Sequence, residues 1–166
     1  VKKRKKRTPA QHLERMGAIL EAGFGDYNDA QFYMREMHRA QLQRLQSIVA
    51  KAEREQSWRF MKGCYKQAAE LYVLASVLYE KHPEHLIMSD AAFDHLGRWL
   101  LKNFKKLPKD FRDWYNITSV DLRAGTGHNV QEQTPIRWMV AIHTGALDET
   151  APQVRPRVLR GDAERG

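Results

Sequence analysis

The chain has 166 residues, of which 42% are hydrophobic and 29% are charged, a length and composition typical of one folded domain. The longest apolar run, residues 71–79, is broken by Ser76 and is too short to span a bilayer, and no apolar signal segment follows the basic N-terminus, so we expect neither a membrane protein nor a secreted one. The single cysteine, Cys64, excludes an intramolecular disulfide and fits a reducing compartment.

The formal net charge of +8 is concentrated at the two ends of the chain. Residues 151–166 carry four arginines against two acidic side chains, whereas residues 8–150 hold 18 basic and 18 acidic side chains and are neutral overall. A basic arm on a neutral body predicts binding of nucleic-acid phosphate or another polyanion, with a solvated extension as the alternative. The arm contributes six positive charges, from Lys2, Lys3, Arg4, Lys5, Lys6 and Arg7.

Two helices are predicted in the N-terminal third. The first begins at Thr8-Pro9, a hydroxyl N-cap followed by proline at the first helical position, and ends near Gly23. The second runs from about Asp29 to the region of residues 53–56. Its apolar stripe consists of Met34, Met37, Leu45, Ile48 and Ala52.

A helical hairpin is predicted in the middle of the chain. Apolar residues recur at i, i+3 and i+4 from Met61 to Tyr79, and this series includes Cys64, which we expect to be an inert core thiol. His82-Pro83 ends this helix because proline disfavours helical backbone at the residue before it. Ser89 caps the next helix, which ends at Leu107-Pro108 and has an inner face of Phe93, Leu96, Leu100, Leu101 and Phe104.

The remaining chain is less regular. A short helical turn with Phe111, Trp114 and Tyr115 is expected to cover the hairpin, and residues 123–129 form a loop that lacks the Lys-Ser/Thr of a P-loop. Thr134-Pro135 opens a last helix that Gly145 closes. We therefore predict an all-α fold, a small bundle around the antiparallel hairpin. The predicted organisation is a basic arm at 1–8, one helical domain at 9–145 with the hairpin at 68–107, and an extended tail at 146–166.

The hairpin carries a motif at its turn. Tyr79-Glu80 ends one helix, and residues 89–96 read Ser-Asp-Ala-Ala-Phe-Asp-His-Leu at the start of the next. This arrangement resembles the small N-terminal helical domain of NAD-dependent DNA ligases, in which the segment recognises the nicotinamide mononucleotide (NMN) half of NAD. The resemblance covers residues 68–107. It implies a nucleotide site formed by Tyr79, Glu80, Asp90, Phe93 and Asp94. If nucleotide binding is retained, we expect Tyr79, Asp90 and Asp94 to line one concave patch beside Glu80, with Asp94 partly open to solvent and free of a local salt bridge.

The motif departs from the family pattern. Glu80 stands where the family has His or Tyr, Phe93 lacks the hydroxyl of the family's Tyr, and the interval from Tyr79 to Asp90 is one residue longer. A third carboxylate repels the phosphate that the same pocket must admit. We therefore expect no bound cofactor, with NMN or NAD as the ligand if the site is retained.

Neither catalysis nor a metal site is expected. No Lys-x-Asp-Gly tetrapeptide, the setting of the lysine nucleophile in nucleotidyl transfer, occurs in the sequence, and the other ligase domains are missing. His82, His85 and His95 lie close in sequence to Asp90 and Asp94, but no i, i+4 histidine pair supports a zinc site. We predict no catalytic residue and no metal ligand.

Three functions remain open. The first is a non-catalytic, nucleic-acid-associated accessory protein whose arm binds phosphate while the body docks on a partner. The second is a structural or virion assembly protein whose tails contact neighbouring subunits or packaged genome. The third is an NMN- or NAD-binding module. Small stand-alone proteins that resemble this ligase domain are typical of bacteriophage genomes, so the expected location is the bacterial host cytoplasm or a virion. A partner protein or a second copy of the chain is the alternative to nucleic acid as a partner. We expect no association with a membrane.

Overall fold

The computed structural model describes residues 27–147 together with Gln11 and Glu14. The chain divides into two compact units, one comprising Val1–Met37 and Glu149–Gly166 and the larger comprising His38–Asp148. The basic arm at residues 2–7, the C-terminal tail from residue 148 onward and most of the predicted first helix lie outside the described residues; Gln11 and Glu14 are helical.

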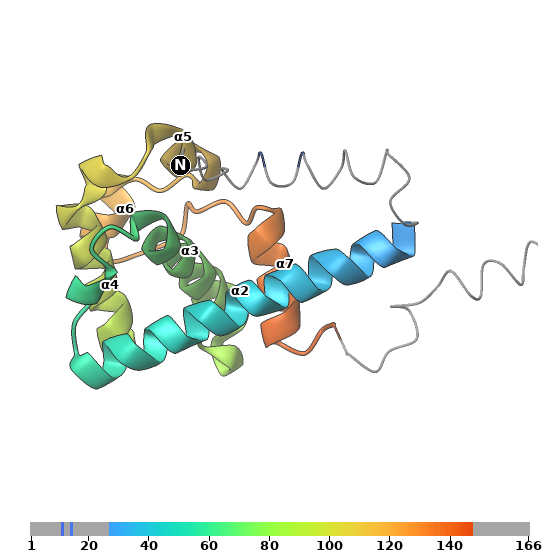
Figure 1. The fold of residues 1–166 in the computed structure, drawn as a ribbon. Helices are drawn as coiled ribbons and strands as arrows, with labels where there is room; N and C mark the ends of the chain where they lie inside the picture. Colours follow the sequence, from blue (N-terminus) through green and yellow to red (C-terminus); the bar gives the residue numbers. More distant parts are fainter. Residues whose placement is uncertain (1–10, 12–13, 15–26, 148–166) are drawn as a thin grey trace, which may run out of the picture. The chain divides into compact units, whose positions relative to one another are not determined.

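All regular structure in residues 27–147 is helical, which confirms the predicted all-α fold (Figure 1). None of these helices combines the length and the apolar character needed to cross a membrane. Three short 3-10 turns, η1 (Arg59–Met61), η2 (Pro83–His85) and η3 (Phe104–Lys106), connect the helices. The α-helices are α2 (Tyr27–Glu55), α3 (Tyr65–Lys81), α4 (Asp90–Lys102), α5 (Lys109–Tyr115), α6 (Ser119–Ala124) and α7 (Thr134–His143).

Helix α3 lies at the centre of the larger unit. Every residue from 68 to 78 is buried, as expected for a helix that is surrounded on all sides. It contacts α4, α7 and η2, and α4 in turn packs against α6. The predicted hairpin packing is confirmed, because five of its apolar residues belong to one buried core: Leu71, Ala75, Leu78, Leu96 and Leu100.

Helix α3 begins later than the periodicity of the sequence predicts. Gly63 has φ +88°, a left-handed conformation that breaks the helical path between Met61 and Tyr65. Cys64 therefore occupies the N-cap position and is exposed, so the prediction of a buried core thiol is wrong. Met61 is buried, but it belongs to η1 rather than to α3.

Helix α6 is absent from the sequence prediction, which placed Arg123 and Ala124 in a loop. It is capped at its start by Thr118, whose Oγ1 accepts a hydrogen bond from the Asp121 backbone N–H, and it ends at Gly125 with φ +72°. Gly97 of α4 faces it: a Cβ at this position would lie 3.9 Å from the Leu122 carbonyl oxygen. This close approach brings the chain that follows α6 next to the hairpin.

Candidate functional site

The five residues that the ligase-like motif singles out line one pocket of about 360 Å³. Tyr79 and Glu80 come from the last turn of α3, and Asp90, Phe93 and Asp94 come from the first two turns of α4. The expectation of one concave patch is confirmed. The opposite wall, which the sequence analysis missed, consists of Ser76, Gly125, Thr126, Gly127 and His128.

The start of α4 sets the position of the two aspartates. The Ser89 Oγ accepts a hydrogen bond from the Ala92 backbone N–H at 3.2 Å, which confirms the predicted cap, and the Ser89 backbone N–H donates to Glu53 Oε1 of α2 at 2.8 Å. Asp90 and Asp94 are one helical turn apart, so their side chains leave α4 on the same face. That face borders the pocket.

The two aromatic residues of the pocket differ in exposure. Phe93 is half-buried, and its ring stacks on that of Tyr72 with the centroids 5.2 Å apart and the planes 6° apart. Tyr79 is 59% exposed, although the periodicity of α3 assigned it to the apolar face. The assignment fails because the last turn of α3 extends past the buried segment that ends at Leu78. Tyr79 therefore offers an open aromatic surface at the pocket.

The loop after α6 is fixed against α3 by close backbone contacts. Gly127 packs on Ser76 so tightly that a Cβ atom at position 127 would overlap the Ser76 side chain. The Tyr72 hydroxyl donates a hydrogen bond to the Thr126 carbonyl oxygen, and the Ser76 hydroxyl donates to the Tyr72 carbonyl oxygen at 2.7 Å. The sequence offers one sign of this close approach: two glycines, separated by Thr126, directly follow Arg123-Ala124.

A buried carboxylate supports this loop. Asp121 is buried; its Oδ1 accepts a hydrogen bond from Asn129 Nδ2 at 2.9 Å, and its Oδ2 has no hydrogen-bond partner in the described part of the chain. Burial, followed by the charge of Asp121, raises the pKa of Tyr72 to about 12. The Tyr72 hydroxyl therefore keeps its proton near neutral pH and remains a donor to the loop.

The pocket is acidic. Glu80, Asp90 and Asp94 are all exposed, and within residues 27–147 none of them forms an ion pair. The expectation that Asp94 is open to solvent and free of a salt bridge is thus confirmed. No lysine or arginine lines the pocket, and His128 is its only basic side chain. Three carboxylates around one concavity concentrate a negative potential there, which attracts cations.

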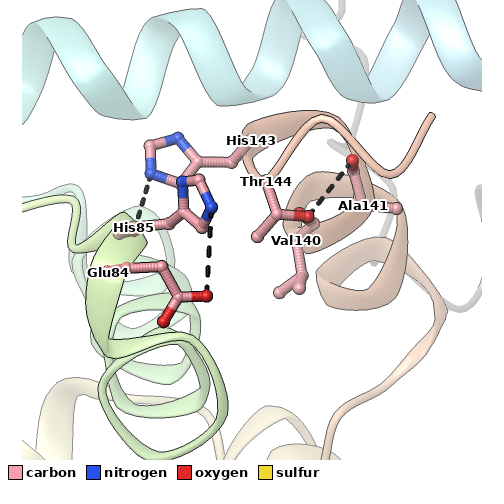
Figure 2. A network of polar contacts seen from close by, with 6 residues as sticks. All are labelled: Glu84, His85, Val140, Ala141, His143 and Thr144. Atoms are coloured by element: carbon pink, nitrogen blue, oxygen red, sulfur yellow. Dashed lines mark hydrogen bonds and ion pairs between the residues drawn. The ribbon is translucent and has the colours of Figure 1, made fainter. Parts of the chain in front are cut away.

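The turn that joins α3 to α4 is tethered to α7 (Figure 2). His143 Nε2 lies 2.9 Å from the His85 carbonyl oxygen and donates to it, and His85 Nε2 lies 3.9 Å from Glu84 Oε1. The other His143 nitrogen, Nδ1, is 3.4 Å from Gln46 Nε2 of α2. These contacts hold η2, and with it the spacing between the end of α3 and the start of α4.

The histidines of this region do not form a metal site with their acidic neighbours. Among the described residues, no group of three or more His, Cys, Asp or Glu side chains is placed to hold a metal ion. The chemistry available at the pocket is an open aromatic ring, three carboxylates and a rigid glycine-containing loop.

Comparison with known proteins gives no match: no family model, no curated protein and no solved structure is similar to this chain.

Proposed function

We propose that the pocket binds the cationic nicotinamide end of a nucleoside or nucleotide, with NMN or NAD as the ligand class. The observation that supports this most directly is the convergence of all five motif residues, from two helix ends, on one pocket. Its volume of about 360 Å³ lies within the usual range for small-molecule sites.

The residues present fit an oxidised nicotinamide ring, which is planar and carries a positive charge. An exposed aromatic face such as that of Tyr79 attracts a cation through its ring quadrupole. Glu80, Asp90 and Asp94 add opposite charge around the same space. Their oxygens also accept hydrogen bonds, so they suit the hydroxyl groups of a ribose attached to the ring.

The residues present do not fit a buried phosphate. Phosphate sites in proteins are built from lysine, arginine or converging backbone N–H groups, and no lysine or arginine lines this pocket. Three carboxylates would repel the phosphate of NMN if it lay between them. We therefore propose that the ring and ribose are bound and that the phosphate points toward solvent. Nicotinamide riboside, which lacks the phosphate, should bind at least as tightly as NMN.

The proposed role is binding and not group transfer. Nucleotidyl transfer proceeds through a lysine nucleophile, and the residues that line the pocket include none. Ser76 supplies the only aliphatic hydroxyl of α3 at the pocket, and this hydroxyl donates a hydrogen bond to the Tyr72 carbonyl oxygen. The carboxylates, the aromatic ring and the glycine loop suit recognition of a ligand.

Isothermal titration calorimetry with NMN tests this function. The wild-type protein should bind, and Asp94→Ala should weaken binding by about tenfold or more, a change of about 1.4 kcal/mol. Asp110→Ala is the matched control, because Asp110 is an exposed carboxylate in the first turn of α5 and does not line the pocket. Absence of heat in all three proteins, or equal affinities for all three, would refute the proposal.

A second candidate function is supported by the charge of the chain. Residues 2–7 supply six of the eight net positive charges, which favours nucleic-acid phosphate as a partner of the arm. Deleting residues 2–7 should remove most affinity for duplex DNA and leave the melting temperature of the protein nearly unchanged. Unaltered DNA affinity after the deletion would rule this candidate out.

A further inference from the structure

The larger unit has a second charged surface, which the zero net charge of residues 8–150 conceals. Two segments, residues 57–69 and 95–109, contain no acidic side chain at all. Together they hold eight basic residues, and all eight are exposed. We name this group the basic face: Arg59, Lys62, Lys66, Arg98, Lys102, Lys105, Lys106 and Lys109.

The hairpin brings these two segments together. Tyr65, at the start of α3, stacks on Trp99 in the last turns of α4, with the ring centroids 5.5 Å apart. Lys106 of η3 places its Nζ 5.4 Å from the centre of the same Tyr65 ring. Because α3 and α4 are antiparallel, the basic face lies at one end of the hairpin and the acidic pocket lies at the other. Helix α4, which connects them, has 13 residues and spans about 20 Å.

Stability of the fold does not explain the basic face. Lys102 in the last turn of α4 complements the helix dipole, but Lys66 in the first turn of α3 opposes it. Of the eight cations, only Lys109 has an ion-pair partner in the described residues, with its Nζ 2.8 Å from Asp113 Oδ2. The other seven have no ion-pair partner in the described residues, so their charge is open to an external anion.

The chemistry of the surface favours a hydrophilic polyanion. Binding in the plane of a membrane surface requires apolar side chains that enter the lipid. The aromatic rings near the basic face are instead covered by cations, with Lys106 over Tyr65 and Arg112 over Phe104. The exposed large apolar side chains of the larger unit lie outside the two basic segments: Tyr79, Leu86 and Val120.

We propose that the basic face binds the phosphate backbone of duplex nucleic acid. Five of these eight lysines and arginines are carried on α4, η3 and the start of α3, which suits phosphate contacts that position a duplex without reading its sequence. This binding is independent of residues 2–7 and of the pocket. Because the pocket and the basic face lie at opposite ends of the hairpin, ligand and duplex can be bound at the same time.

Binding of a labelled DNA duplex to the full chain, measured by fluorescence anisotropy over a range of salt concentrations, tests the proposal. The triple variant Lys66→Gln, Lys102→Gln, Lys106→Gln should lower the slope of log K against log salt by about 2.7, since each phosphate contact contributes about 0.9. The control variant Arg54→Gln, Arg123→Gln, Arg137→Gln removes the same charge from exposed positions outside the basic face and should leave the slope nearly unchanged. Lys102→Gln alone, with an expected reduction of about 0.9, keeps the test valid if the triple variant unfolds.

Equal slopes for the triple variant and its control would overturn the proposal. The proposal would also be overturned if the protein bound vesicles containing phosphatidylserine and did not bind the duplex, because its partner would then be a membrane surface. Repeating the comparison after deletion of residues 2–7 separates the basic face from the arm. If the three substitutions still lower the salt slope in the chain that lacks residues 2–7, the basic face binds the duplex independently of the arm.

Discussion

Gly127 packs directly on Ser76, and a Cβ atom at position 127 would overlap both the Cβ and the Oγ of that serine. The contact joins the loop after α6 to the middle of α3 and so fixes the two walls of the pocket relative to each other.

Gly127→Ala should therefore destabilise the fold and distort the pocket. Overpacking of this kind costs about 1–3 kcal/mol, which urea unfolding measures. The double variant Ser76→Gly, Gly127→Ala removes the Ser76 Cβ and should lose less stability than the sum of the two single variants. An unfolding free energy unchanged by Gly127→Ala would show that the loop moves away from α3 without cost.

Leu96 should be among the most sensitive residues of the hairpin. Leu96 lies on α4 and is completely buried in the core, so Leu96→Ala should lower the unfolding free energy by about 2–5 kcal/mol. Val120→Ala is the control, because Val120 is 71% exposed and its truncation should change stability by no more than about 0.5 kcal/mol. Losses of similar size in both variants would contradict the packing described for α3 and α4.

Glu70 of α3 should make the stability of the protein depend on pH. Burial raises the pKa of its carboxyl to about 7, against the opposing effects of hydrogen bonds from Tyr115 and Gln41 and of the charge on Arg44. The folded protein thus holds this proton more tightly than the unfolded chain, in which the pKa is about 4.5. The contribution of Glu70 to the unfolding free energy is fully present below pH 4.5 and falls by about 3 kcal/mol as the pH rises to 7 and above.

Glu70→Gln isolates this effect, because the other titrating groups are common to both proteins. Urea unfolding of wild type and variant at about pH 5 and about pH 8 should show a steeper loss of stability with rising pH in the wild type. The variant should lose less stability than the wild type between the two pH values, because its glutamine carries no charge at either pH. Identical pH dependence in the two proteins would show that Glu70 ionises as readily in the folded chain as in the unfolded one.

Much of the hairpin could be predicted from the sequence because its signals are local. The His82-Pro83 stop, the Ser89 cap and the four-residue spacing of Asp90 and Asp94 each depend on a few neighbouring residues. The start of α3 was missed because an apolar residue stands at the expected spacing on both sides of Gly63, so the periodicity continues across a break in the helix.

The second wall of the pocket could not be predicted in the same way. Helix α6 has six residues, too few to show a helical period, and the loop after it is placed by contacts with Tyr72 and Ser76, which are distant in the sequence. The basic face was overlooked for a related reason. Summing charge over residues 8–150 gives zero, and only the antiparallel packing of α3 and α4 shows that the cations share one end of the hairpin.

Tyr79 should contribute to ligand affinity through the face of its ring. Tyr79→Ala should weaken NMN binding by about 2- to 30-fold, the equivalent of a cation–π contact of about 0.5–2 kcal/mol. Tyr79→Phe keeps the ring and should bind nearly as well as the wild type. Since Tyr79 is mostly exposed, neither change should alter the melting temperature much. Equal weakening by both substitutions would assign the contribution to the hydroxyl group instead.

The central claim is that the pocket recognises the positive charge of the nicotinamide ring. Titration calorimetry with NMN and with its reduced form tests this most directly, because the two ligands share the ribose and the phosphate while reduction removes the charge of the ring. We predict that oxidised NMN binds at least about tenfold more tightly than reduced NMN, a difference of about 1.4 kcal/mol. Equal affinities for the two forms, or tighter binding of the reduced form, would contradict the claim.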